Sequence, residues 1–170
     1  MTAFEKGLAL HEAGRGRDAL EQLELATREE PESAEAWYWF AVVQDALGLE
    51  STAVPCYREA LRLGCRRAAE AHAYLASSLQ KTWNASGGYG EIQRALAVAP
   101  DNALFHLIHA NVLADMRRWK EAEEEYRVTL RLDPKRADAW HRLGQLLGAA
   151  GRHQEAWEAF KAALEYQEGF

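Results

Sequence analysis

The chain has 170 residues, of which 48% are hydrophobic and 27% are charged. It is therefore long enough to bury a sizeable core, and its composition is that of a folded protein rather than a disordered one. The formal net charge of -6 argues against a general affinity for nucleic acid or for anionic membranes, because both require a basic face.

The cysteines and the N-terminal segment indicate the compartment. Cys56 and Cys65 stand at a spacing that matches no zinc pattern, so we expect reduced thiols in a cytoplasmic protein. The opening residues MTAFEKGLAL contain neither a long apolar run nor a cleavage-like site, and nowhere do about 18 apolar residues follow one another. We therefore expect a chain that neither carries a signal peptide nor spans a membrane.

One order of large and small residues recurs along the chain, and it is most complete in ADAWHRLGQLLGAAGRHQEAWEAFKAAL, residues 137–164. Apolar residues recur every three or four positions on both sides of Gly151, which predicts two amphipathic helices joined by a tight turn. Gly144 and Ala156 let the two backbones approach closely. Trp140, Leu147 and Phe160 fill the space around that contact.

The first two copies of this pattern predict two helix pairs. Residues 1–33 carry it in Gly7, Leu10, Gly14, Ala19, Leu23, Ala26 and Pro31. Residues 34–68 carry it in Trp37, Ala41, Gly48, Ala53, Tyr57 and Ala60. Ser33 is the expected N-cap of the second pair.

The third copy, residues 69–102, is irregular in its middle, which reads Trp83-Asn84-Ala85-Ser86-Gly87-Gly88-Tyr89-Gly90. Each glycine lowers helix propensity by about 1 kcal/mol relative to alanine. We therefore expect the second helix to start late, near Gly88 to Glu91, with Trp83 and Tyr89 flanking the break. Exposed aromatic residues in a loop are candidate contact residues for a partner. The alternative is that Trp83 folds back and plugs the gap.

The last two copies complete the chain. Residues 103–136 end with Asp133-Pro134, and residues 137–170 contain the reference stretch. Since no linker or low-complexity tract remains, the sequence predicts a single domain over 1–170.

This pattern resembles the tetratricopeptide repeat, a helix-turn-helix unit of about 34 residues. The resemblance implies an all-α fold, an α-solenoid in which five repeats and about ten antiparallel helices form a right-handed superhelix. A narrower likeness rests on Val54-Pro55-Cys56-Tyr57, Ala60-Leu61-Arg62-Leu63-Gly64 and Leu75-Ala76-Ser77-Ser78-Leu79. These segments are similar to the bacterial group 5 tetratricopeptide domain, which has no assigned activity.

The resemblance also implies a function, a non-catalytic scaffold that binds a protein or peptide segment in a concave groove. The first helix of each repeat lines that groove, and its expected partner-binding residues are Phe4, Tyr38, Val42, Asp45, Ser77, Leu107, Asn111, His141 and Gln145. Some members of the family hold the carboxylate tail of chaperones with Lys and Asn. Here Phe4, Leu8, Tyr38 and Val42 stand at the opening positions of such a clamp, and this disfavours that ligand.

Histidine clusters are the remaining chemical candidates. His72, His106 and His109 are expected to pack between helices as hydrogen-bonded rings, although neighbouring repeats could bring them together as metal ligands. No phosphate-binding loop and no nucleophile motif is present in the sequence. We therefore predict no catalytic residue, no metal site, no cofactor and no enzymatic activity.

The end of the sequence suggests an alternative function. Solenoids normally finish with a polar capping helix, whereas here the fifth repeat leads directly into Glu165-Tyr166-Gln167-Glu168-Gly169-Phe170. We expect uncovered apolar surface from Leu146, Leu147, Trp157, Phe160 and Leu164. The chain would then be a structural repeat protein that forms homo-oligomers through its terminal repeats, or a partner would cover this surface.

Overall fold

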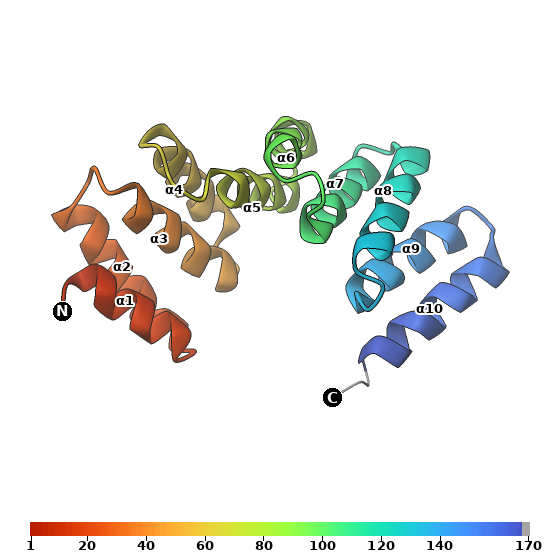
Figure 1. Ribbon diagram of the computed structural model, residues 1–170, viewed down its shortest axis with the longest axis horizontal. Helices are drawn as coiled ribbons and strands as arrows, with labels where there is room; N and C mark the ends of the chain where they lie inside the picture. The colour runs from red at the N-terminus through yellow and green to blue at the C-terminus, as the bar shows by residue number, and fades with distance from the viewer. Residues whose placement is uncertain (168–170) are drawn as a thin grey trace. The chain divides into compact units, whose positions relative to one another are not determined.

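The computed structural model describes residues 1–167, and these residues form helices and no strands (Figure 1). The predicted all-α fold of antiparallel helix pairs is confirmed. In chain order the helices are α1 (Ala3–Glu12), α2 (Gly16–Glu29), α3 (Ala34–Ala46), α4 (Glu50–Arg62), α5 (Ala68–Lys81), α6 (Ala85–Val98), α7 (Ala103–Asp115), α8 (Trp119–Leu132), α9 (Ala137–Ala149) and α10 (His153–Gln167).

The helices belong to two compact units. Unit 1 is Met1–Ala95, and unit 2 begins at Leu96. In unit 1 each helix from α1 to α4 packs on the next one along the chain, and in unit 2 α7 packs on α8, α8 on α9 and α9 on α10. A single domain over the whole chain stays a prediction. Of the described helices, none has the length and apolar character needed to cross a membrane.

Close contact between the two helices of a pair depends on one small residue. Gly7 on α1 faces Leu23 on α2, and Gly144 on α9 faces Phe160 on α10. A Cβ atom at either glycine would lie under 3.0 Å from the facing side chain. In the other pairs the equivalent residues are Ala41, Ala76 and Ala110, all fully buried. The repeat therefore selects glycine or alanine here for space rather than for backbone flexibility.

The turn within each pair has one residue in the left-handed backbone region. In three pairs this residue is Gly14, Gly48 or Gly151, with φ between 72° and 78°. In the other two it is Trp83, with φ 63°, and Arg117, with φ 60°. A side chain in this conformation costs about 1–2 kcal/mol. The tight helical hairpin thus imposes the same turn whatever residue occupies it.

The expected late start of the second helix in the third pair is wrong, because α6 begins at Ala85. The Asn84 Oδ1 atom accepts a hydrogen bond from the Gly87 amide at 3.0 Å, so it caps the first turn despite the glycines. Gly88 is buried at the position that Ala122 and Ala156 occupy in later pairs. Tyr89 consequently lies inside α6 rather than in a loop.

Two glycines on α9 test this explanation of the pairing. We expect Gly144→Ala to destabilise the protein by about 1–3 kcal/mol, because the new Cβ would lie 2.8 Å from the Phe160 ring. Gly148→Ala is the matched control, since its new Cβ would meet only Ala156 at 3.8 Å. Alanine there should stabilise the helix by about 0.5–1 kcal/mol. Urea unfolding of both variants measures the difference, and equal effects would contradict the space argument.

Candidate functional site

Three pairs anchor the start of their first helix with the same hydrogen bond. The indole nitrogens of Trp37 and Trp140 donate to the carbonyl oxygens of Pro31 and Pro134, at 2.8 and 2.9 Å. In the fourth pair the His106 Nε2 atom lies 2.7 Å from the Pro100 carbonyl oxygen. His106 therefore replaces tryptophan as a structural donor.

The second nitrogen of His106 faces a carboxylate. Its Nδ1 atom lies 2.6 Å from Glu125 Oε2, and His109 Nδ1 lies 3.4 Å from Oε1 of the same residue. Burial opposes ionisation of Glu125, but the neighbouring rings of His109 and His106 outweigh it and lower the pKa of this carboxyl. The same arrangement joins His72 to Glu91 at 2.7 Å. The predicted packing of hydrogen-bonded histidines between helices is confirmed for His72 and His106. Among residues 1–167, no group of three or more His, Cys, Asp or Glu is placed to hold a metal ion.

In unit 1, two of the expected groove residues make contacts inside the protein instead of lining a groove. Tyr38 is only 4% exposed, and its ring packs edge-on against Trp39. Asp45 accepts hydrogen bonds from the hydroxyls of Tyr57, at 3.0 Å, and Ser78, at 2.9 Å. The remaining three are half-buried, and they are Phe4, Val42 and Ser77.

In unit 2, the four expected groove residues divide in the same way. Leu107 is buried, and the Asn111 Oδ1 atom accepts the hydrogen bond of the Tyr126 hydroxyl at 2.8 Å. His141 and Gln145 on α9 are exposed. The His141 ring lies 5.5 Å from the Phe160 ring, measured between centroids.

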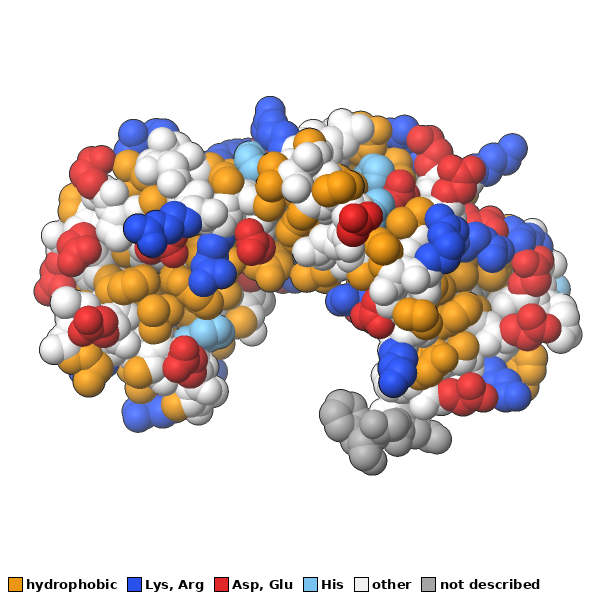
Figure 2. Space-filling model, viewed as in Figure 1, with side chains coloured by type: hydrophobic (Ala, Val, Ile, Leu, Met, Phe, Trp, Pro, Cys, Tyr) orange, Lys and Arg blue, Asp and Glu red, His pale blue; other side chains and the backbone are white. Residues whose placement is uncertain are grey.

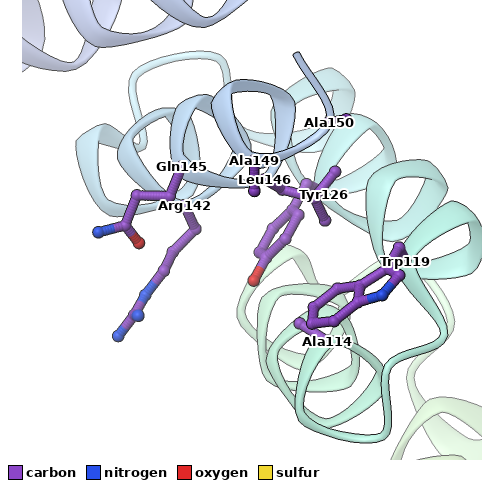
Figure 3. Close-up of a pocket in the computed structure, with 8 residues that line it drawn as sticks. All are labelled: Ala114, Trp119, Tyr126, Arg142, Gln145, Leu146, Ala149 and Ala150. Atoms are coloured by element: carbon purple, nitrogen blue, oxygen red, sulfur yellow. The ribbon is translucent and has the colours of Figure 1, made fainter. Parts of the chain in front are cut away.

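An apolar cavity of about 470 Å³ opens between α7, α8 and α9 (Figure 3). We call it the α7–α9 cavity, and its lining residues are Ala114, Trp119, Tyr126, Arg142, Gln145, Leu146, Ala149 and Ala150. Its volume falls within the range of about 300–1,000 Å³ that is usual for ligand pockets. Of these residues, the groove offsets in the sequence predicted Gln145 and, at the last inward-facing position of the fourth repeat, Ala114.

The walls of the cavity combine aromatic side chains with very small ones. Ala114, Ala149 and Ala150 leave room, while Trp119 and Tyr126 provide broad apolar surfaces. Trp119 remains 53% exposed. Burial raises the pKa of Tyr126 to about 12, with Arg142 opposing and Asp115 adding to the shift, so its hydroxyl stays neutral.

The turn before α8 positions Trp119. Arg117 takes the left-handed conformation, and Trp119 is the first residue of α8. The equivalent positions in the other pairs hold Gly16, Glu50, Ala85 and His153. The sequence alone shows that only the fourth pair has a tryptophan at this position, but the repeat pattern assigns the position no role.

A second cavity, of about 720 Å³, lies between α9 and α10. Its lining includes His141, Arg142, Gln145, Phe160 and Leu164. In the view of Figure 2, hydrophobic side chains gather over these two helices with charged side chains around them.

Apolar surface on α10 is also open. Trp157 is 66% exposed and Leu164 is 58% exposed, as the sequence predicted. Leu147 is buried, so its predicted exposure is wrong. It packs inside because it belongs to the face of α9 that meets α10.

Trp83 projects from the turn between α5 and α6. Its side chain is 97% exposed, so the alternative that it plugs a gap is wrong. No gap exists there, because α6 starts directly after Asn84.

Comparison with known families matches residues 4–64 and 109–169 to a model described as Tetratricopeptide repeat. The Protein O-mannosyl-transferase Tmtc1 of Drosophila melanogaster is 34% identical over 85 residues, which are 48% of this chain and 10% of that protein. The chain therefore spans about a tenth of the length of this relative.

Several solved structures share the fold. A crystal structure of MamA is 23% identical, with a TM-score of 0.79 over 95% of this chain and 94% of that one. MamA from Desulfovibrio magneticus RS-1, residue 41 to the end, is 19% identical, with a TM-score of 0.83 over 97% and 93%. YrrB, described as a TPR protein with an unusual peptide-binding site, is 20% identical, with a TM-score of 0.75 over 98% and 86%. At these identities the likeness shows the fold alone.

We expect Trp83→Gly to stabilise the protein by about 1 kcal/mol, because glycine relieves the left-handed strain while an exposed side chain loses no burial. Thr82→Gly is the control. Thr82 has φ -92°, and its hydroxyl donates to the Ser78 carbonyl at 2.8 Å, so this variant should be destabilised. Thermal unfolding measures both, and a lower melting temperature for Trp83→Gly would contradict the strain argument.

Proposed function

Because the chain belongs to the tetratricopeptide repeat family, we propose that it is a non-catalytic protein-interaction scaffold that binds a protein or peptide segment at the α7–α9 cavity. The observation that carries this proposal is the apolar cavity itself, with a half-exposed tryptophan on its wall. Aromatic residues in such positions dominate the binding energy of many protein interfaces.

The shape of the site favours a side chain of a polypeptide as its ligand. Three alanines line the cavity, so one large apolar side chain can enter between Trp119 and Leu146. YrrB, which has the same fold, is described as having a peptide-binding site. The expected groove residue Gln145 lies at this site, and His141 lies one helical turn before it.

The remaining features support a scaffold in the cytoplasm of a bacterium. Cys56 and Cys65 are free and buried, and burial raises the pKa of the Cys56 thiol to about 11. A buried neutral thiol is unreactive, which suits a structural role. The bacterial assignment rests on the likeness to the group 5 domain, which stays a prediction. Trp83 is a further contact candidate in unit 1, because its indole ring is exposed.

Selection from a random peptide library displayed on phage tests the proposal. We expect wild-type protein to enrich peptides that share an apolar residue. Trp119→Ala should weaken binding of an enriched peptide by about tenfold or more, because it removes one wall of the cavity. Trp157→Ala is the matched control, since this exposed tryptophan does not line the α7–α9 cavity.

Fluorescence anisotropy with the labelled peptide measures both affinities. If wild type, Trp119→Ala and Trp157→Ala all bind the peptide with equal affinity, the peptide does not bind at the α7–α9 cavity. The absence of any enriched peptide that binds saturably would contradict the proposed function.

Self-association is a second candidate, and the exposed surface of α9 and α10 favours it. In the fourth pair, Leu107 on α7 and Leu130 on α8 are buried, and α9 packs on α8. The equivalent residues of the fifth pair, His141 and Leu164, are exposed and line the second cavity. A second copy of the chain would cover the same kind of surface that α9 covers on the fourth pair.

Analytical ultracentrifugation over a range of concentrations tests this candidate. We expect a concentration-dependent dimer that Leu164→Glu abolishes, because the charge would be buried in the interface. Glu158→Lys, on the same helix but outside the second cavity, is the control. A monomer at every concentration would rule self-association out.

A further inference from the structure

We propose that the segment bound at the α7–α9 cavity carries an aspartate or glutamate beside its apolar anchor, and that Arg142 and Gln145 recognise this carboxylate. The inference rests on the proposed function and specifies the chemistry of its ligand. It follows from the polar groups at the margin of the cavity rather than from its apolar walls.

Arg142 and Gln145 stand three positions apart on α9, so their side chains are neighbours on one face of the helix. Figure 3 shows both side chains projecting from α9, with Tyr126 between them and Trp119. Both residues also line the second cavity, between α9 and α10. They therefore form a polar ridge between two hollows.

Within residues 1–167 the Arg142 guanidinium has no ion-pair or hydrogen-bond partner. Other arginines of unit 2 are occupied: Arg127 is 2.9 Å from Glu123, and Arg152 is 2.8 Å from the same carboxylate. The Asp138 carboxylate, one turn before Arg142, lies 3.2 Å from Arg136 instead. Arg142 is thus a cation at an apolar margin whose hydrogen-bond donors pair with no other residue of the described range 1–167.

The other polar groups at the cavity also favour a ligand group that accepts hydrogen bonds. The Tyr126 hydroxyl donates its proton to Asn111. The Trp119 indole N–H has no internal partner in the described chain and can only donate. Two donor side chains and one amide therefore surround the opening. A carboxylate accepts hydrogen bonds through both oxygens and fits the planar guanidinium, whereas a lysine or arginine of the ligand would meet a like charge.

The position of the ridge indicates that the recognised carboxylate belongs to a side chain within the ligand rather than to the C-terminus of the ligand. A segment that crosses Arg142 and Gln145 has a hollow on each side, so the chain can continue in both directions. The apolar anchor fills the α7–α9 cavity, and the carboxylate lies next to it over the ridge. The neighbouring apolar surface lowers the local dielectric constant and strengthens the pairing.

The experiment uses dodecamer peptides displayed on phage with their C-termini joined to the coat protein, so that no free terminal carboxylate is present. We expect wild-type protein to enrich an apolar residue together with a nearby Asp or Glu. In the synthetic peptide with an amidated C-terminus, replacing that residue by Asn or Gln should weaken binding about tenfold to a hundredfold.

Arg142→Glu provides the decisive comparison. This variant should keep the apolar anchor but enrich Lys or Arg in place of the acidic residue. Arg131→Glu makes the same change of charge on the neighbouring helix, outside both cavities, and should keep the acidic preference. Both arginines are exposed, so we expect both variants to keep the fold. Circular dichroism melting curves of the two variants check this.

The outcomes separate the inference from the proposed function. Enriched apolar anchors without an acidic preference, or an acidic preference that Arg142→Glu leaves unchanged, would overturn the inference while the cavity remains a binding site. A failure of wild-type protein to enrich any peptide would overturn both.

Discussion

The distance between the two helices of each pair is the constraint on which the rest of this structure depends. Where Gly7 and Gly144 stand, the facing side chain occupies the space of a Cβ atom, and alanine is the largest residue at the equivalent positions. This close approach decides which residues are buried on each helix. It also decides which residues remain on the outside, including Trp119 and Arg142, and hence where a ligand can bind.

The same constraint explains why irregular sequence did not produce irregular structure. The segment from Asn84 to Gly90 contains three glycines, yet α6 keeps its full length. Helix propensity contributes about 1 kcal/mol per glycine, and the tertiary contacts of the buried Gly88 and Ile92 outweigh it. The turn before it is equally fixed, because Trp83 adopts the conformation that glycine has elsewhere.

Most of the fold could be predicted from the sequence, because the periodic small and large residues report packing directly. The candidate site was far less predictable. Tyr38 and Leu107 satisfy the repeat offsets for a groove, but their bulk draws them into the core. The α7–α9 cavity arises instead from residues that depart from the pattern, above all Trp119, and from small residues whose effect depends on three helices at once. Offsets within one repeat cannot supply that information.

The left-handed turn has a practical consequence. At Gly14, Gly48 and Gly151 nothing lies within 4 Å of the position that a Cβ atom would take, and at Trp83 a whole indole ring extends into water without disturbing either adjoining helix. This corner therefore accepts a new side chain at a known backbone cost and without repacking. Since the native thiols of Cys56 and Cys65 are buried, an added cysteine at such a corner would be the accessible thiol for attaching a spectroscopic label.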